Sequence, residues 1–314
     1  MQEISPETPE ERAKRGAVRS RFDRSLDRVR PGSKAFAVLK RVAVGVYSDG
    51  FIHAGNLAYL ALLTLFPFFI ILAALAQFFG HGPDTLRAID SFLRTVPPAV
   101  AQLLRQPIMD VLAARTGSLL WLGALVGLWT VGSFIETIRD ILRRAYGTGY
   151  SRAFWHYRMT SAALIIVSVV MALAAFSAQV LLTAAEQFIT RLLPFASDMG
   201  RWIGLGRLAP LAMLAVALYF LFYSLTPSKY RLSACPKWPG AMFTALWWMS
   251  VTMALPHALA LLGGYDRTYG GLAGTIIALF FFWLVGFGLV IGAHLNAALA
   301  ETPGSRVREA PDTA

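Results

Sequence analysis

The chain has 314 residues, of which 56% are hydrophobic and only 15% are charged. Soluble domains carry about 25% charged residues, so this composition excludes an ordinary soluble protein. A formal net charge of +11 would indicate nucleic-acid binding in a soluble chain, but in membranes basic residues also set the orientation of helices. The single cysteine, Cys235, excludes an internal disulfide.

Long apolar runs follow one another along the chain, separated by short charged loops. The six runs cover roughly residues 51–79, 118–137, 159–183, 208–225, 240–262 and 270–300. About 20 apolar residues allow an α-helix to cross the hydrocarbon core of a bilayer. Backbone polar groups in lipid must be satisfied within the segment, so the runs are predicted to be helices. The expected fold is therefore all-α, a polytopic membrane bundle of six transmembrane helices.

The basic residues are distributed unevenly between alternate loops. Of the 29 Lys and Arg residues, 21 fall on the side of the two termini and 8 fall on the other side. Loops rich in Lys and Arg stay in the cytoplasm. The count of six spans and this bias together predict cytoplasmic N and C termini.

The two ends of the chain differ in composition from its middle. Residues 1–33 are polar, mixed in charge and without apolar periodicity, which predicts a disordered basic tail in the cytoplasm. Residues 301–314 predict a second disordered cytoplasmic tail. The six-span membrane domain is therefore expected over residues 34–300.

Amphipathic segments are expected outside the spans. From Ser33 onward, apolar residues at helical spacing alternate with basic ones, which predicts a helix on the inner leaflet that leads into the first span. The loop 80–117 contains two apolar stripes separated by Pro97 and Pro98. These stripes predict two interfacial helices on the periplasmic face, which either cap the bundle or offer a docking surface.

Small residues and prolines recur within the spans. Glycines four apart allow helix backbones to approach closely, and a proline inside a helix removes a hydrogen bond and predicts a kink. The packing glycines are Gly123, Gly127, Gly288 and Gly292, and the prolines are Pro67 and Pro256. Kinked helices line cavities in transporters, although a purely structural role also fits.

The motifs of common catalytic sites are missing from the sequence. It contains no Walker-type phosphate loop, H-E-x-x-H, C-x-x-C or nucleophile elbow. The five histidines are scattered singly, without the spacing of metal ligands. We therefore expect no metal and no other cofactor, and we expect that the chain is not an enzyme.

Polar side chains at membrane depth are expensive to bury and mark candidate sites. Under the predicted topology, such side chains lie at the cytoplasmic ends of the first, second and sixth spans. They are His53, Asn56, Glu136, Arg139, His294 and Asn296. We interpret them as the lining of a polar vestibule. The alternative is that they are interfacial residues solvated by lipid headgroups.

A series of short motifs runs from the first span to the last. They are Ala54-Gly55-Asn56-Leu57-Ala58-Tyr59, Thr64-Leu65-Phe66-Pro67, Pro239-Gly240-Ala241 with Trp247 and Trp248, Tyr269-Gly270, and Gly292-Ala293-His294-Leu295-Asn296. In order and spacing they resemble the YihY/BrkB family of bacterial inner-membrane proteins, over roughly residues 35–300. The resemblance implies six spans in the inner (plasma) membrane with both termini cytoplasmic. The family commonly has an acidic residue at the position of His294, so a carboxylate-dependent role there does not carry over.

The resemblance implies no settled activity, since family members have carried the labels ribonuclease BN and serum-resistance virulence factor. We expect a transport or envelope-biogenesis component that handles a lipid or other amphiphile. A non-transporting scaffold or assembly factor is the alternative. A membrane-bound ribonuclease is least favoured, because the basic loops lack an acid/base pair or a metal site. The expected partners are membrane lipids and a periplasmic envelope protein, and no nucleic acid.

Overall fold

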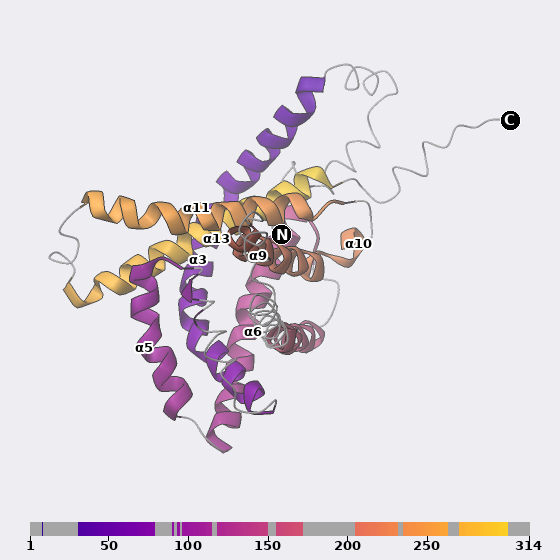
Figure 1. Cartoon of the computed structure of the whole chain (residues 1–314). Coiled ribbons are helices and arrows are strands. Elements are labelled where there is room, and N and C mark those ends of the chain that lie inside the picture. Colours follow the sequence, from indigo (N-terminus) through magenta and orange to yellow (C-terminus); the bar gives the residue numbers. More distant parts are fainter. Residues whose placement is uncertain are drawn as a thin grey trace, which may run out of the picture.

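The computed structural model describes residues 8, 31–78, 90, 93–94, 96–114, 118–149, 155–171, 205–231, 235–262 and 270–300. All regular elements within this part of the chain are helical. They are α3 (Pro31–Phe78), α5 (Pro98–Ala114), α6 (Ser118–Tyr146), α9 (Leu205–Leu225), α10 (Ser228–Arg231), α11 (Trp238–Leu262), the 3-10 turn η1 (Gly270–Leu272) and α13 (Ala273–Leu299), together with a helix over Trp155–Met171. The expected all-α fold is confirmed for these residues (Figure 1).

Helices of the described part are long and apolar enough to cross a membrane at four places. These candidate spans are Gly50–Ile71, Trp121–Tyr146, Trp238–Leu261 and Ala273–Leu299. Shorter apolar helices, Trp155–Met171 and Leu211–Leu225, lie where the third and fourth spans are predicted. Residues 172–183, the predicted continuation of the third span, lie outside the described residues. The described part thus contains four candidate spans, and the count of six stays a prediction.

Helix α13 is the central helix of the described part. It packs against α3, lies beside α11 and also contacts α5 and α6 (Figure 1). Phe281, Val290 and Ala293 on this helix have no exposed surface. A helix that is apolar on all sides is stable when it is buried on all sides, and this explains why the most apolar predicted span takes the central place.

Helix α3 is a single helix of 48 residues, longer than a membrane span requires. The sequence predicts an amphipathic helix followed by a span, and the structure joins the two without a break. Val42 and Val46 pack against Ala298 at the end of α13, whereas Leu39 and Tyr47 are exposed. The N-terminal part of α3, indigo in Figure 1, extends away from the other helices, and the apolar face with Val42 and Val46 anchors its base to the end of the central helix.

Helix α5 begins at Pro98, where the sequence predicts a break between two amphipathic helices. Proline is well suited to the first turn of a helix because no backbone N–H is needed there. Val100, Leu104 and Ile108, four residues apart, are buried in the core formed with α3 and α13. Residues 79–89, which include much of the first predicted amphipathic helix, lie outside the described residues.

Helices α11 and α13 approach each other closely at two of the predicted glycines. A Cβ atom on Gly288 would collide with the ring of Trp247, and one on Gly292 would collide with the hydroxyl of Thr244. Gly240 on α11 faces the same contact, because its added Cβ would meet the backbone of Gly292. Both helices thus depend on residues without a side chain for this contact.

The remaining predicted glycines and prolines lie on α3, α6 and α11. A Cβ on Gly127 of α6 would lie 2.9 Å from the carbonyl oxygen of Pro67 in α3. Gly123 is half-buried one turn earlier on α6. Pro67 and Pro256 both lie inside their helices, as predicted.

Candidate functional site

The C-terminal end of α6 forms one wall of a cavity. Gly147 ends the helix with a φ of 71°, in the left-handed region that favours glycine. Its N–H donates to the carbonyl of Arg144 at 3.0 Å, and the N–H of Thr148 donates to the carbonyl of Arg143 at 2.9 Å. This pair of bonds is a Schellman motif. It places Thr148 and Gly149 beside the last turn of α6, where both line the cavity.

The opposite wall is formed by the end of α9 and the short helix α10. Pro227 follows the end of α9 and cannot continue its hydrogen bonds. Nη2 of Arg231 in α10 donates to the carbonyl oxygens of Ser224 and Thr226. The guanidinium therefore satisfies carbonyls that the end of α9 leaves without helical partners.

Buried side chains hold α10 against the end of α6 and against the segment that precedes α11. Tyr230 of α10 is fully buried, and its ring centroid lies 5.1 Å from that of Tyr146 at the end of α6. Nζ of Lys237 donates to the carbonyls of Tyr230 and Arg231, both at 2.8 Å. Burial lowers the pKa of Lys237 below its ordinary value, because the charged form loses solvation.

A cavity of about 310 Å³ lies between these walls and the start of the helix Trp155–Met171. Its cations come from two elements, Arg139 and Arg143 from α6 and Lys229 and Arg231 from α10. The rest of the polar lining is Thr148, His156, Tyr157, Thr160, Ser224, Thr226 and Ser228. The described lining contains no Asp or Glu. Such a concave group of cations attracts anions.

A tyrosine holds two of the guanidinium groups side by side. The guanidinium carbon of Arg143 lies 4.2 Å from the ring centroid of Tyr157, and that of Arg139 lies 5.3 Å from it. Nη1 of Arg139 also donates to the carbonyl of Tyr157 at 3.4 Å. The positive charges of Arg143 and Arg231 both act on Arg139. Cation–π contacts therefore help to keep mutually repelling groups together.

Next to the cavity, Arg158 forms a network with α6. Its Nη1 lies 3.3 Å from Oε2 of Glu136 and donates to Oγ of Ser133 at 3.1 Å. Its guanidinium lies 3.9 Å from the ring centroid of Trp129. Arg158 is 6% exposed, and a buried cation needs such partners to offset its lost solvation.

The acidic side chains of α6 near the cavity form ion pairs with arginines that are not part of the cavity lining. Glu136, whose charge acts on Arg139, forms the ion pair with Arg158. Asp140 forms an ion pair with Arg144 at 2.9 Å, one turn along the helix. Among the described residues, Glu136 and Asp140 are thus paired with arginines that lie outside the lining of the cavity.

The structure puts the six residues of the predicted vestibule in different surroundings. Arg139 lines the cationic cavity, and Glu136 lies in the adjoining network with Arg158. Asn296 is buried at the contact of α13 with the start of α11. Its Oδ1 accepts from the N–H of Gly240 at 2.8 Å and its Nδ2 donates to the carbonyl of Lys237 at 3.1 Å.

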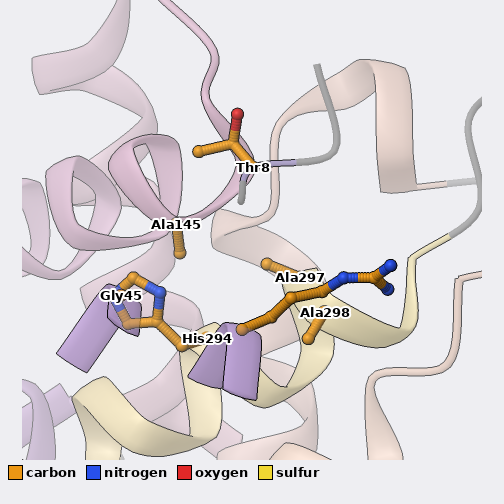
Figure 2. A pocket seen from close by; sticks show the side chains of 7 residues that line it. Thr8, Gly45, Ala145, His294, Ala297 and Ala298 are labelled. Carbon is orange, nitrogen blue, oxygen red and sulfur yellow. The ribbon is translucent and has the colours of Figure 1, made fainter. Parts of the chain in front are cut away.

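The two predicted histidines and Asn56 belong to the region around α3. His294 of α13 lies directly over Gly45 of α3 and borders a hollow of about 10 Å³ (Figure 2). That volume is the room needed for about one water molecule, so this hollow is no ligand site. His53 is half-buried and Asn56 is exposed. None of the three is in the lining of the cationic cavity.

Sequence reasoning missed most of the cationic lining. The missed residues are Arg143, His156, Tyr157, Lys229 and Arg231. The signal was present, since the loops 138–158 and 226–238 are rich in Arg and Lys. Read only as determinants of topology, these charges gave no sign that they converge.

Metal ligands are not gathered anywhere in the described part of the chain. Among those residues, no group of three or more His, Cys, Asp and Glu side chains could hold a metal ion. The polar side chains of the cavity are four cations, hydroxyl groups and the imidazole of His156, which can bind an anion through hydrogen bonds and charge.

The helices and the cavity define a polytopic α-helical membrane protein with a cationic pocket at the ends of α6 and α9. The family model described as Virulence factor BrkB matches residues 47–314, and the chain belongs to this family. The resemblance seen in the sequence motifs is thereby confirmed.

Relatives of the chain agree with this membership. The ribonuclease-like protein YfkH of Bacillus subtilis (strain 168) is 30% identical over 258 residues, which cover 80% of this chain and 90% of YfkH. The UPF0761 membrane protein PSHAa0171 of Pseudoalteromonas translucida (strain TAC 125) is 23% identical over 280 residues, 83% of this chain and 87% of that protein. No solved structure matches the chain.

Proposed function

We propose that this protein is a component of the bacterial inner membrane that handles an anionic amphiphile, in transport or in biogenesis of the envelope. The observation that carries the proposal is the cationic cavity of about 310 Å³ between α6, α9 and α10. Arg139 and Arg143 are buried and Arg231 is half-buried, and buried cations in a membrane protein are expensive and are a functional hypothesis by default.

Apolar surface next to the cavity supports a ligand with a lipid tail. Trp155 and Met159, at the start of the helix that borders the cavity, are exposed. Tyr219 and Phe220 on α9 are also exposed. In a bilayer these side chains would contact acyl chains, and aromatic residues favour the headgroup level. A cationic pocket beside apolar faces matches the two parts of an anionic amphiphile.

The topology that we propose has six spans and cytoplasmic termini, because alternate segments carry 21 and 8 of the Lys and Arg residues. Under this topology α6 and α9 both end on the cytoplasmic side, and the cavity faces the inner leaflet. Reporter fusions after Thr148 and Ala314 should report the cytoplasm, and a fusion after Gly80 the periplasm. A cytoplasmic signal at Gly80 would contradict the topology.

The function can be tested by lipid analysis of a deletion strain. Inner and outer membranes are separated, and the distribution of anionic lipids is compared with that of the parent strain. We expect an anionic lipid to accumulate in one membrane, with rescue by the wild-type protein and by Arg144→Gln but not by Arg143→Gln. An unchanged distribution would favour the alternative, a scaffold or assembly factor that only needs packing surfaces.

A nuclease is the competing function, because the relative YfkH is called ribonuclease-like. We propose that the present chain is not an enzyme, since the described lining of its cavity offers one imidazole, His156, and no carboxylate to pair with it, whereas RNA cleavage needs an acid/base pair or a metal-bound water. Purified protein incubated with precursor tRNA and Mg²⁺, Mn²⁺ or Zn²⁺ should leave the RNA intact. Cleavage that a point variant abolishes would contradict this part of the proposal.

A further inference from the structure

We infer that the cationic cavity recognises the phosphomonoester or diphosphate headgroup of a lipid, a group with more than one negative charge. The lipid part of this inference rests on the proposed function, and the headgroup part rests on the cavity itself. The distinction matters because the abundant anionic phospholipids are phosphodiesters with a single charge per phosphate.

The charge of the lining favours a ligand with more than one negative charge. Four Lys and Arg side chains line the cavity, and its described lining has no carboxylate. A phosphodiester brings only one negative charge to these four cations. A phosphomonoester carries about −1.5 to −2 charges at pH 7, and a diphosphate carries more. These groups therefore match four lining cations better.

The donors of the cavity fit phosphate oxygens in kind. Guanidinium groups present planar forks that bind phosphate through two parallel hydrogen bonds, and Tyr157 holds those of Arg139 and Arg143 side by side. Oγ1 of Thr148 and Nε of Arg231 are buried without a hydrogen-bond partner in the protein. A buried donor without a partner is costly, and a phosphate oxygen in the cavity would supply one.

The size of the cavity separates the headgroup from the rest of the lipid. Ligand pockets occupy about 300–1,000 Å³, so a cavity of about 310 Å³ is large enough for a phosphorylated headgroup and too small for acyl chains as well. The chains would remain outside, along the exposed faces of the helix Trp155–Met171 and of α9.

The experiment measures binding of short-chain lipids to the purified full chain in detergent. The probes are dioctanoyl phosphatidic acid, a phosphomonoester, and dioctanoyl phosphatidylglycerol, a phosphodiester with the same tails. Glycerol 3-phosphate serves as the soluble phosphomonoester. We expect phosphatidic acid to bind about tenfold or more tightly than phosphatidylglycerol, a difference of about 1.4 kcal/mol, and glycerol 3-phosphate to bind more weakly than phosphatidic acid.

Variants tie the binding to the cavity. Arg143→Gln and Lys229→Gln should each weaken binding of phosphatidic acid about tenfold. Arg144→Gln is the matched control, because it removes the same charge from the next position of α6 but does not line the cavity. It should bind as the wild type does. Lys229 is exposed, so its variant keeps the test valid if Arg143→Gln does not fold.

The possible failures are distinguishable. Equal affinity for the two lipids would overturn the inference about the headgroup and leave the proposed function standing. No binding of either lipid would overturn both. Glycerol 3-phosphate binding as tightly as phosphatidic acid would assign the cavity to a soluble phosphate and overturn the lipid part. If Arg143→Gln and Arg144→Gln lose equal affinity for phosphatidic acid, binding does not occur in this cavity.

Discussion

The contact between α11 and α13 and the cavity at the ends of α6 and α9 both place polar groups inside an apolar bundle, but they satisfy them differently. At the contact, the two polar atoms of Asn296 have partners in Gly240 and Lys237. Oγ1 of Thr244 lies 2.8 Å from the carbonyl of Gly240 and 3.3 Å from that of Gly288. These polar groups join two helices and need no ligand.

In the cavity, cations gather without carboxylates in the described lining. Arg231 and Thr148 each retain a buried polar atom without a hydrogen-bond partner. Both regions contain buried polar side chains, so burial does not distinguish them. The hydrogen-bond partners distinguish the two regions. A network in which every polar group has a partner stabilises the fold, whereas a group that keeps unsatisfied polar atoms is costly and is retained for binding.

The largest expected effect is on the contact between α11 and α13. In Gly288→Ala the new methyl group collides with the ring of Trp247, which also donates through Nε1 to the carbonyl of Leu284 at 2.8 Å. We expect a loss of about 3 kcal/mol in the free energy of unfolding, measured as a lower melting temperature in detergent.

The matched control is Gly55→Ala in α3, where an added Cβ meets nothing within 4 Å. This variant should be neutral or more stable by up to about 1 kcal/mol, because alanine is the better helix former. If both variants melt like the wild type, the close packing of α11 and α13 is not what stabilises the bundle.

The next largest effect is expected for Asn296→Ala, which leaves the N–H of Gly240 and the carbonyl of Lys237 without their partner. Unsatisfied buried groups cost about 1–3 kcal/mol each, so we expect a loss of about 2 kcal/mol in thermal or denaturant unfolding. Asn56→Ala, at an exposed asparagine, should change stability little. If Asn296→Ala keeps the stability of the wild type but loses lipid binding, Asn296 belongs to the binding site and has no structural role.

A smaller effect is expected for Glu136→Gln, which removes the ion pair with Arg158. Arg158 keeps its hydrogen bond to Ser133 and its contact with Trp129, so the loss should be about 1 kcal/mol. Binding of phosphatidic acid should persist, because the cavity loses no cation. Affinity that falls as far as in Arg143→Gln would place Glu136 in the binding site.

The smallest effect is expected for Arg144→Gln. Its ion pair with Asp140 is partly exposed, with about a third of the Arg144 side chain accessible, and such pairs contribute roughly 0–1 kcal/mol. The melting temperature should stay near that of the wild type at ordinary ionic strength. A loss as large as that of Asn296→Ala would show that this pair, and not only the buried contacts, supports the end of α6.

The fold follows from local patterns more closely than the site does. Apolar runs predict the spans, Pro98 predicts the start of α5, and Gly288 and Gly292 lie at a helix contact. Asn296 shows the limit, because its partners lie 56 and 59 residues away in the sequence. No local pattern reveals that these groups meet.

The cavity was not predicted for the same reason. Arg139 and Arg143 are within reach of α10 because Tyr146 packs on Tyr230, and this contact joins segments far apart in the chain. In sequence the basic residues stand in two separate loops, where they fit the bias of cytoplasmic segments. Their convergence becomes visible only in the packed structure.

Native mass spectrometry of the protein released from bacterial membranes tests the central claim most directly. The wild type should retain a lipid with a phosphomonoester or diphosphate headgroup, which tandem fragmentation identifies, and Arg144→Gln should retain the same lipid. Arg143→Gln should lose it while keeping the melting temperature of the folded protein. The claim that this cavity binds a lipid headgroup would be contradicted if the wild type is released without any anionic lipid. It would also be contradicted if Arg143→Gln retains the same lipid in the same amount as the wild type.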